Sequence, residues 1–597
     1  MRNRKQNNRG VALVTTLIFL STVVVAVTSY MGTTTSALRM ARHREMDLRL
    51  LNLCEAGFQA ELVALWIPFK VSQRFDAMDA AYPGASPENP LGVISGTYDG
   101  VGAYTVGIVG YDAPDTYNRF VTLRAVGFRD LNNNGQLDSG EPYRTVETVQ
   151  RFSLDRSGVF DYAYFANNYG WMTGFGQNDL IVNGDMRANG DFTISDGIPT
   201  VNGSIYACAN NRLVPPAQGL VNIAPNQWSN STYASNGDTR KRQAYDPSIH
   251  GAKGSEEYEQ WRDLIYDAEA SIVNGRFSGS VLADSRGVRD FQDVVLDTNP
   301  TKEMTLPDLN DLNYYISLSQ NWVDQKATFG DGTPNPNYGD EAYIEVWNSS
   351  LNRYVRVTTN GVYNGSIGLI GTSSKPIKIH GPVTITHDAV IKGYVQGQGT
   401  LYTGRNVHVV GSIIYKNPPS FVGSSPASID AANEKKDVLA LAARGSIIMG
   451  NTKKFGTIPL RYMTPPFTKG RYDDLGNWVP PFDAKAIDSY GIQKYAPLLG
   501  HAYVDSVSSN INQLDCILYT NFVGGGNIGG GGTGVTFNGS IICKDEAMVL
   551  WSLPMKMNYD NRIRERALTN SPLIDIALPR SPSLTRAVWQ SKGLKNY

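Results

Sequence analysis

The chain has 597 residues and a net charge of −1, which excludes a protein drawn to nucleic acid by bulk charge. Only 18% of the residues are charged, whereas glycine (59) and tyrosine (32) are frequent, a composition that favours a strand- and loop-rich extracytoplasmic protein over a helical cytosolic enzyme. The length allows about three to five domain-sized units, or fewer if one of them is a solenoid.

The first predicted element is a long helix behind a short basic leader. Four basic residues lie within residues 2–9, Gly10 follows, and residues 11–38 carry no charge. Residues 11–30 are long enough to span a bilayer, since ~20 apolar residues cover ~30 Å. The basic leader predicts a cytoplasmic N-terminus. The apolar run is too long for a signal peptide, and the helical pattern continues past it, so we expect one retained helix that ends near Pro68.

Two segments of this helix resemble type IV pilins and pseudopilins. Arg9-Gly10-Val11-Ala12-Leu13-Val14 resembles the prepilin cleavage site, and Cys54-Glu55-Ala56-Gly57-Phe58 resembles the Ala-Glu-Ala-Gly segment of PilX-type minor pilins. The resemblance implies that prepilin peptidase cuts after Gly10 and methylates the new N-terminus at Val11. It also implies that the helix assembles with other pilin or pseudopilin subunits.

Thr15 departs from the pattern of the major pilins, which carry a glutamate at the fifth residue after the cut. In that family the buried carboxylate pairs with the N-terminal amine of a neighbouring subunit, and an unpaired carboxylate at this depth is costly. Thr15 cannot form this ion pair. Its absence is typical of PilX-type minor pilins and of the K-type tip pseudopilin of type II secretion, so the resemblance implies an initiating or tip-located subunit in low copy.

Residues 69–155 are predicted to form a small antiparallel sheet with a calcium-type loop. Apolar residues alternate around 104–108 and 121–125, and a β-branched and aromatic segment follows at 144–154. Between the last two strands, Gly135 provides a turn and oxygen donors follow the spacing of a calcium loop: Asp130, Asn132, Asn134, Gln136 (through its backbone carbonyl), Asp138 and Glu141. We expect a structural calcium site of modest affinity; the alternative is a polar hairpin turn without an ion.

Residues 156–560 are predicted to form a parallel β-helix with inserts at 209–340. Asn-Gly or Asp-Gly pairs recur every six or seven residues between 183 and 203, and short apolar segments separated by glycines return at 365–415, 439–449 and 516–550. Asn-Gly pairs also mark hairpins, so an antiparallel sandwich is the alternative. Residues 561–597 are expected to form an irregular tail.

The cysteines and the absence of catalytic motifs complete the site predictions. Cys54 is expected to be a small core residue, whereas Cys516 and Cys543 are a candidate disulfide in an oxidising compartment. The sequence shows no carboxylate pairs at a coil period, no zinc-type cysteine spacing and no phosphate-binding or nucleophile-elbow motif. We therefore predict no catalytic residues and no enzymatic activity.

Together these observations predict an α+β protein: a leader (1–10), a long pilin-like helix (11–68), a small antiparallel sheet and a parallel β-helix. We expect a minor, tip-located subunit of a type IV pilus-like filament that displays the β-helix to cap the tip or to adhere to an extracellular surface or glycan. The chain would be a single-pass protein of the inner membrane before it reaches the pilus or cell surface, with no nucleic acid as partner. Two alternatives stay open, namely a membrane-anchored β-helical enzyme that degrades polysaccharide and a K-type tip pseudopilin of protein secretion.

Overall fold

The computed structural model divides the protein into two compact units, which we describe separately: unit 1 (Met1–Asp155 and Pro582–Tyr597) and unit 2 (Arg156–Ser581). The structure describes residues 9–98, 100–167, 170–173, 180–190, 192–195, 200–202, 205–210, 217–218, 221–223, 283–284, 287–288, 303–450, 471–472, 478–479, 501–527, 534–544, 546–550, 554–564 and 571–595.

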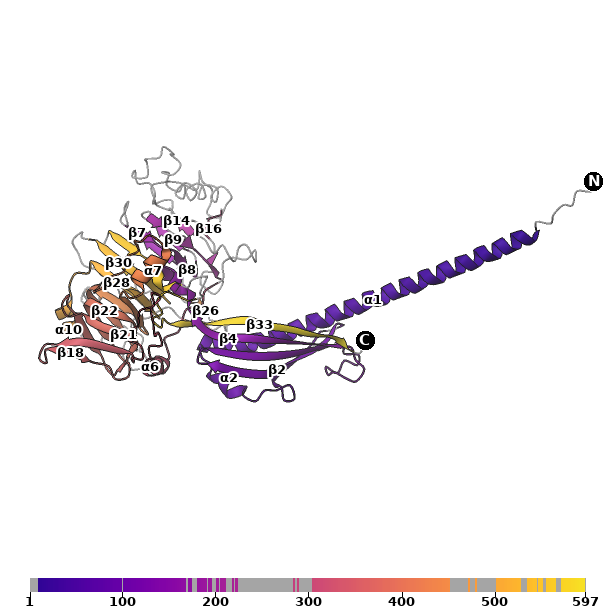
Figure 1. Cartoon of the computed structure of the whole chain (residues 1–597), viewed down its shortest axis with the longest axis horizontal. Helices are drawn as coiled ribbons and strands as arrows, with labels where there is room; N and C mark the ends of the chain where they lie inside the picture. Colours follow the sequence, from indigo (N-terminus) through magenta and orange to yellow (C-terminus); the bar gives the residue numbers. More distant parts are fainter. Residues whose placement is uncertain are drawn as a thin grey trace, which may run out of the picture. The chain divides into compact units, whose positions relative to one another are not determined.

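Unit 1 is built on one long helix, α1 (Arg9–Ser72), which begins where the basic leader meets the apolar run (Figure 1). Its second half packs on the sheet, and the buried residues recur every three or four positions: Leu50, Leu53, Cys54, Phe58, Leu65 and Phe69. The helix continues through Pro68 to Ser72, beyond the expected end. Leu65 and Phe69 lie on either side of the proline in the core, so packing holds the last turn despite the missing N–H.

The sheet of unit 1 has five strands in the order β1-β2-β3-β4-β33, and a short helix, α2 (Asp76–Ala81), precedes it. The strands are β1 (Leu91–Tyr98), β2 (Gly102–Asp115), β3 (Asn118–Phe128), β4 (Tyr143–Arg156) and β33 (Arg580–Lys595). The pairings from β1 to β4 are antiparallel, which confirms the predicted antiparallel sheet.

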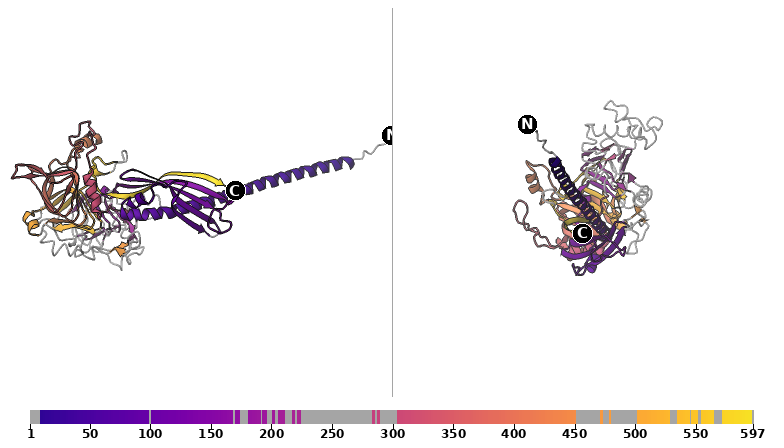
Figure 2. Two further views of the ribbon diagram at one scale, coloured as in Figure 1. Left: turned by 90° about the horizontal axis from the view of Figure 1, so that it is seen from below. Right: turned by 90° about the vertical axis from the view of Figure 1, so that its right-hand side faces the viewer.

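The strand β33 lies within the segment that was expected to be an irregular tail, so that expectation was wrong for these residues (Figure 2). The strand has a proline at its third position, Pro582, and most of its middle is exposed. An exposed edge strand does not need the alternation of apolar and polar residues by which strands are recognised. It is tied to β4 by side chains as well: Thr148 Oγ1 donates to Val588 O at 2.8 Å, and Arg144 donates to Ser591 Oγ.

Small residues allow α1 and β3 to approach closely. A Cβ atom at Gly127 would lie 2.4 Å from the carbonyl oxygen of Leu50, so only glycine fits there. Next to it, the sulfur of Cys54 accepts the N–H of Gly127 at 3.2 Å and lies 3.4 Å from the carbonyl oxygen of Arg144. Burial raises the pKa of Cys54 to about 11, so the thiol stays neutral. Its predicted role as a small core residue is confirmed.

In unit 2, nineteen strands of the described residues form one hydrogen-bonded set. These strands are β5 (Tyr164–Ala166), β7 (Leu180–Asn183), β8 (Met186–Ala188), β10 (Thr200–Asn202), β11 (Ile205–Tyr206), β17 (Tyr343–Asn348), β18 (Arg353–Arg356), β19 (Val362–Tyr363), β20 (Ile367–Gly371), β21 (Ile377–Ile385), β22 (Ala389–Thr403), β23 (Val407–Tyr415), β24 (Val438–Ala443), β25 (Ile447–Gly450), β28 (Gln513–Thr520), β29 (Val523–Asn527), β30 (Val535–Cys543), β31 (Glu546–Leu550) and β32 (Met555–Asn558).

Smaller elements accompany this set. The remaining strands form two- or three-stranded sheets: β6 (Gly170–Thr173), β9 (Phe192–Ser195), β12 (Ala209–Asn210), β13 (Ala217–Gln218), β14 (Val221–Ile223), β15 (Ala283–Asp284), β16 (Gly287–Val288), β26 (Arg471–Tyr472) and β27 (Trp478–Val479). The described helices are η1 (Gly158–Asp161), α6 (Leu312–Gln320), α7 (Pro426–Asn433), α10 (His501–Val507) and η5 (Asn561–Ile563). Most of the predicted inserts at residues 209–340 lie outside the described residues.

Strands in the large set pair mainly in parallel. The pairings of β17 with β18 and β21 are antiparallel, whereas the neighbouring strands β21, β22, β23 and β24 pair in parallel, as do β28, β30, β32 and β7. Such pairing disagrees with the alternative of an antiparallel sandwich. Aliphatic side chains of these strands form one buried cluster that includes Ile379, Val383, Leu401, Leu441 and Leu518.

An amide ladder connects the two ends of the Asn-Gly pattern. The side chain of Asn183 donates to that of Asn558 at 2.7 Å, and Asn558 donates to Asn538 at 2.8 Å. Asn538 in turn donates to Asp515 Oδ1 at 2.7 Å, which ends the ladder on a carboxylate. Asn202 pairs in register with Asn183, so the similar segments that begin at Asn202 and Asn538 lie on one continuous row of stacked strands.

The candidate disulfide between Cys516 and Cys543 is not formed. Both residues are buried cysteines outside any disulfide, as are Cys54 and Cys208. The parallel register of β28 and β30 sets Cys516 opposite Gly539 and Cys543 opposite Thr520, four positions further along the strand. Four residues of a strand span about 13 Å, well beyond the reach of a disulfide.

Candidate functional site

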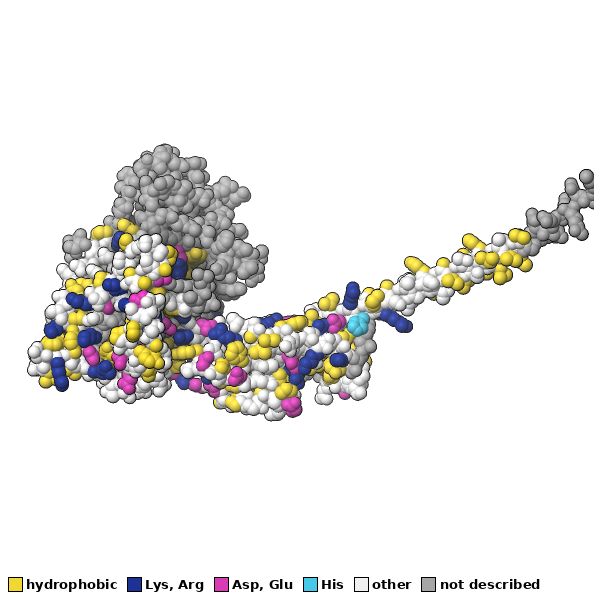
Figure 3. All heavy atoms as spheres, viewed as in Figure 1, with side chains coloured by type: hydrophobic (Ala, Val, Ile, Leu, Met, Phe, Trp, Pro, Cys, Tyr) yellow, Lys and Arg dark blue, Asp and Glu magenta, His cyan; other side chains and the backbone are white. Residues whose placement is uncertain are grey.

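The N-terminal part of α1 is a large apolar surface that the rest of the described chain does not cover. Val11, Leu17 and Phe19 are 67%, 67% and 70% exposed. The most apolar 18-residue window has a mean hydropathy of 2.4 and no buried residue, and the helix is long and apolar enough to cross a membrane (Figure 3). Soluble monomers rarely expose so large an apolar surface. This segment therefore requires a lipid bilayer or helices of other chains around it.

Hydroxyl groups within this apolar segment bond to the backbone of the same helix. Thr15 Oγ1 donates to Val11 O at 2.7 Å, and Thr16 and Thr22 bond in the same way to the carbonyl oxygens four residues before them. A hydroxyl paired within its own helix can enter hydrocarbon without a lost hydrogen bond. Thr15 is thus placed in the first turns of α1 with its proton engaged. Gly10 and Val11 lie at the start of the same helix, and residues 1–8 of the leader lie outside the described residues.

A second basic cluster ends the apolar segment, and the sequence analysis did not use it. Arg39, Arg42 and Arg44 are exposed on α1, with His43 among them. Because basic residues lie on both flanks of the apolar run, the charge difference between the flanks is small. The positive-inside rule therefore favours a cytoplasmic N-terminus less strongly than the leader alone suggests.

The loop between β3 and β4 is closed by its own hydrogen bonds. Asp130 accepts the N–H groups of Asn134 (3.1 Å) and Gly135 (2.6 Å), and Gly135 has a φ of +73°. Glu141 is 3% exposed; its two oxygens accept the N–H groups of Leu131 (2.7 Å) and Asp138 (3.0 Å). The loop thus has the turn that the predicted ligand spacing requires.

The side-chain oxygens of the same loop do not converge on one point. Asn132 and Asn134 direct their amide N–H groups to Asp138 Oδ2, at 2.7 and 2.8 Å, and Gln136 donates its backbone N–H to Asn134 Oδ1 at 2.8 Å. Within the part of the chain that the structure describes, no three His, Cys, Asp or Glu side chains are grouped as metal ligands. A calcium ion would need both amides to turn their oxygens inward, and the site stays a prediction.

Glu61 is a buried carboxyl that the sequence analysis did not single out. It lies on the sheet-facing side of α1, is 2% exposed, and its Oε2 atom has no hydrogen-bond partner. A Cβ atom at Gly92 of β1 would lie 3.3 Å from Glu61 Oε1, which places the carboxyl against the edge strand. Burial raises the pKa of Glu61 to about 7, and its charge helps to raise the pKa of Tyr82. The available signal was a charged residue three positions after Phe58 and four before Leu65 on an apolar helix face.

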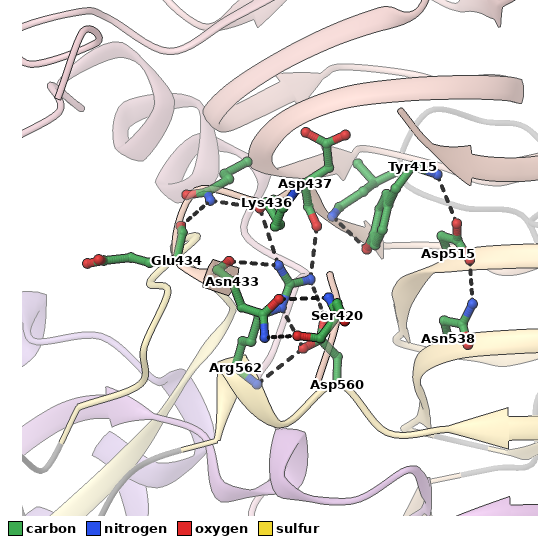
Figure 4. Close-up of polar contacts among 12 residues, drawn as sticks. Tyr415, Ser420, Asn433, Glu434, Lys436, Asp437, Asp515, Asn538, Asp560 and Arg562 are labelled. Atoms are coloured by element: carbon green, nitrogen blue, oxygen red, sulfur yellow. Dashed lines mark hydrogen bonds and ion pairs between the residues drawn. The ribbon is translucent and has the colours of Figure 1, made fainter. Parts of the chain in front are cut away.

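In unit 2, a buried arginine holds the segment around η5 (Figure 4). Arg562 is 1% exposed; its guanidinium forms two hydrogen bonds with Asp560, at 2.9 and 2.6 Å. The remaining donors reach the carbonyl oxygens of Asn433 and Lys436 at 3.3 Å and of Asp437 at 2.9 Å. Asp560 directly precedes η5, and the three carbonyl groups belong to the last residue of α7 and to the segment between α7 and β24. The geometry is that of a structural clamp, with the charge paired and its donors engaged.

Comparisons with known proteins give little further information. No protein-family model matches the chain. No curated protein matches it either. Among solved structures, the chain is similar to the competence-associated pilin ComZ from Thermus thermophilus, with 12% identity over 92% of this chain and 98% of that chain, at a TM-score of 0.25. A TM-score this low does not establish a shared fold.

Proposed function

We propose that the chain is a minor subunit of a type IV pilus-like filament that is cut after Gly10, methylated at Val11 and assembled through α1. The observation that supports this best is the division of α1 into two parts. Its first part is apolar and uncovered, and its second part is packed on an antiparallel sheet of the same unit. A simple membrane anchor does not require one rigid helix to continue from the apolar part into the core of a folded unit.

Thr15 supports a tip or low-copy position in the filament. A glutamate there would form an ion pair with the N-terminal amine of a neighbouring subunit, whereas the hydroxyl of Thr15 is engaged within its own helix. We therefore propose that the chain lies at the tip or at another low-copy place. Before assembly it would lie in the inner membrane with its N-terminus in the cytoplasm, and afterwards on the pilus or cell surface.

The strands of unit 2 would form a parallel β-helix that the filament displays. Support comes from the parallel register of its strands and from the ladder of Asn183, Asn558 and Asn538. Stacked identical side chains of this kind require strands that repeat in register along one axis. We propose that this body adheres to an extracellular surface or glycan, or caps the tip, and that it has no catalytic activity.

Mass spectrometry of the N-terminus tests the filament proposal. The protein is isolated from native membranes and from sheared filaments, together with a Gly10→Val variant and an Asn8→Ala control. We expect wild type and control to begin at methylated Val11 in filaments, and the Gly10→Val variant to keep its leader and stay in the membrane. A wild-type chain that retains residues 1–10 and is found only in membranes would contradict the proposal. It would favour a membrane-anchored enzyme, to be assayed for polysaccharide cleavage.

A tip pseudopilin of type II secretion would be processed in the same way, so only its location in the cell distinguishes it from a pilus subunit. Recovery of the methylated chain with a secretion apparatus, and its absence from surface pili, would favour that alternative.

For the loop at residues 130–141 we propose a structural calcium ion held by Asp130, Asn132, Asn134, Asp138 and Glu141 with the carbonyl of Gln136. The ion would supply only charge neutralisation and cross-linking of the loop.

A further inference from the structure

The hairpin β17–β18 carries three aromatic rings that are each covered by a cation from β18, from β21 or from the residues just before β21. Lys375 Nζ lies 3.4 Å from the ring centroid of Trp347, and Lys378 Nζ lies 3.9 Å from that of Tyr354. Trp347 and Tyr354 pair directly across the hairpin, with ring centroids 5.4 Å apart. We call this set, together with Arg356 and Tyr343, the cation–aromatic face.

Charge on this face is strongly one-sided. Arg356 is exposed and Lys375 and Lys378 are half-buried, whereas Glu345 is the acidic residue of the three strands. Glu345 lies 3.7 Å from both Arg356 and Lys378, so its one charge is shared between two cations. The chain as a whole carries a net charge of −1, so the positive charge of this face is a local excess. In Figure 3 the region over β18 and β21 shows dark-blue and magenta side chains among yellow ones.

The stacking of cations on rings restricts what the face can bind. Single-stranded nucleic acid binds to aromatic residues by placing bases on open ring faces. Here a cation lies over the ring faces of Trp347, Tyr354 and Tyr343, where Arg356 lies 4.3 Å from the centroid. Each ring instead holds its cation in place, which lowers the entropy that the cation loses when it binds an anion.

We infer that the cation–aromatic face binds an acidic polysaccharide through its carboxylate or sulfate groups. The regularly spaced anions of such a polymer match a row of cations that Glu345 does not neutralise. This inference deepens the proposed adhesive role, because it names the chemical class of the surface that unit 2 would recognise. The inference depends on the proposed function only for the claim that unit 2 is displayed at the cell surface, where it would meet such a polymer.

Binding of polygalacturonate to the full chain in detergent tests the inference. Biolayer interferometry would compare immobilised polygalacturonate, neutral dextran of equal size and duplex DNA. We expect polygalacturonate to bind, dextran not to bind, and affinity to fall at least about tenfold when salt rises from about 0.05 M to about 0.5 M. The double variant Arg356→Gln/Lys375→Gln should lose at least about tenfold in affinity, since two cations of the face are removed.

Two controls separate the effect from damage to the fold. Arg356→Lys/Lys375→Arg keeps both charges and should bind nearly as the wild type does. Lys556→Gln removes an exposed cation from β32, away from the face in the register of the strands, and should not change binding. Equal binding of dextran, tighter binding of DNA than of polygalacturonate, or unchanged affinity of the double glutamine variant would each overturn the inference. A methylated filament subunit that does not bind polygalacturonate would contradict this inference alone, whereas a binding chain with an intact leader would contradict the filament proposal alone.

Discussion

Replacing Glu61 by glutamine tests whether one buried carboxyl sets the pH dependence of unit 1. Folding raises the pKa of Glu61 from its ordinary 4.5 to about 7 because the carboxyl is buried. The folded state therefore binds the proton more tightly than the unfolded state. The protonated carboxyl makes its full contribution to the free energy of unfolding below pH 4.5, and this contribution is lost as pH rises through about 7. At ~1.4 kcal/mol per pKa unit, the loss amounts to about 3 kcal/mol.

Glutamine keeps the shape of the neutral carboxyl and cannot ionise. We therefore expect Glu61→Gln to equal the wild type in stability near pH 4 and to exceed it by up to about 3 kcal/mol above pH 7. Hydrogen exchange of the full chain, read by mass spectrometry in peptides of α1 and β2 between about pH 5 and about pH 8, measures the opening of unit 1 without unfolding unit 2. Glu45→Gln, on the exposed side of the same helix, is the matched control and should keep the wild-type slope. A wild type whose corrected protection does not change with pH, or a Glu61→Gln variant with the wild-type slope, would refute the reasoning.

Three further perturbations follow from the structure. Arg562→Lys should destabilise unit 2 by about 3–5 kcal/mol, since lysine cannot replace the two hydrogen bonds to the buried carboxylate of Asp560 and the three to backbone carbonyl groups. Faster hydrogen exchange in peptides around residues 554–564 would confirm this expectation. Unchanged exchange would show that the arginine is dispensable. Gly127→Ala should lower the stability of unit 1 by about 1–3 kcal/mol, because the new Cβ atom would lie 2.4 Å from the carbonyl oxygen of Leu50. Gly32→Ala is the control, because its new Cβ atom would have no neighbouring atom within 4 Å. Equal melting temperatures of the two variants would contradict the close approach of α1 and β3. Excess calcium should raise the melting temperature of unit 1 by several degrees, as expected for ~1 kcal/mol in a domain of this size, and Glu141→Gln should abolish the rise; a melting curve that neither calcium nor chelator shifts would leave the loop without an ion.

The elements predicted well from sequence are those with a local signal. The charge-free run and its helical continuation lie within one segment, so α1 was recognised except for the last turn after Pro68. The strands β3 and β4 alternate clearly because one face of each is buried. Glu61 was missed because a charged residue is not expected on the buried face of a helix, although a period of 3.6 residues places position 61 between the buried residues Phe58 and Leu65.

What sequence could not provide is the partner of each strand. The strand β33 is polar and exposed. Its partner β4 precedes unit 2 in the chain, whereas β33 follows it, so no neighbouring segment of the sequence indicates the pairing. The candidate disulfide failed for a related reason. Cys516 and Cys543 both lie in strands as expected, but the register of β28 on β30 separates them, and register depends on the packing of the whole stack. The calcium ligands were judged by spacing alone, which does not determine the direction of the amides of Asn132 and Asn134.

The placement of β33 has a consequence for the order in which the protein is made. All of unit 2, Arg156–Ser581, is synthesised between β4 and the strand that completes its sheet. At translation rates of ~5–20 residues per second, the hydrogen-bonding edge of β4 stays open for on the order of half a minute or longer. An open edge is a site for wrong pairing with another chain. Closure of this edge therefore marks a chain whose body has already been translated, and a chain cut short before β33 would expose the unpaired edge of β4 to proteases.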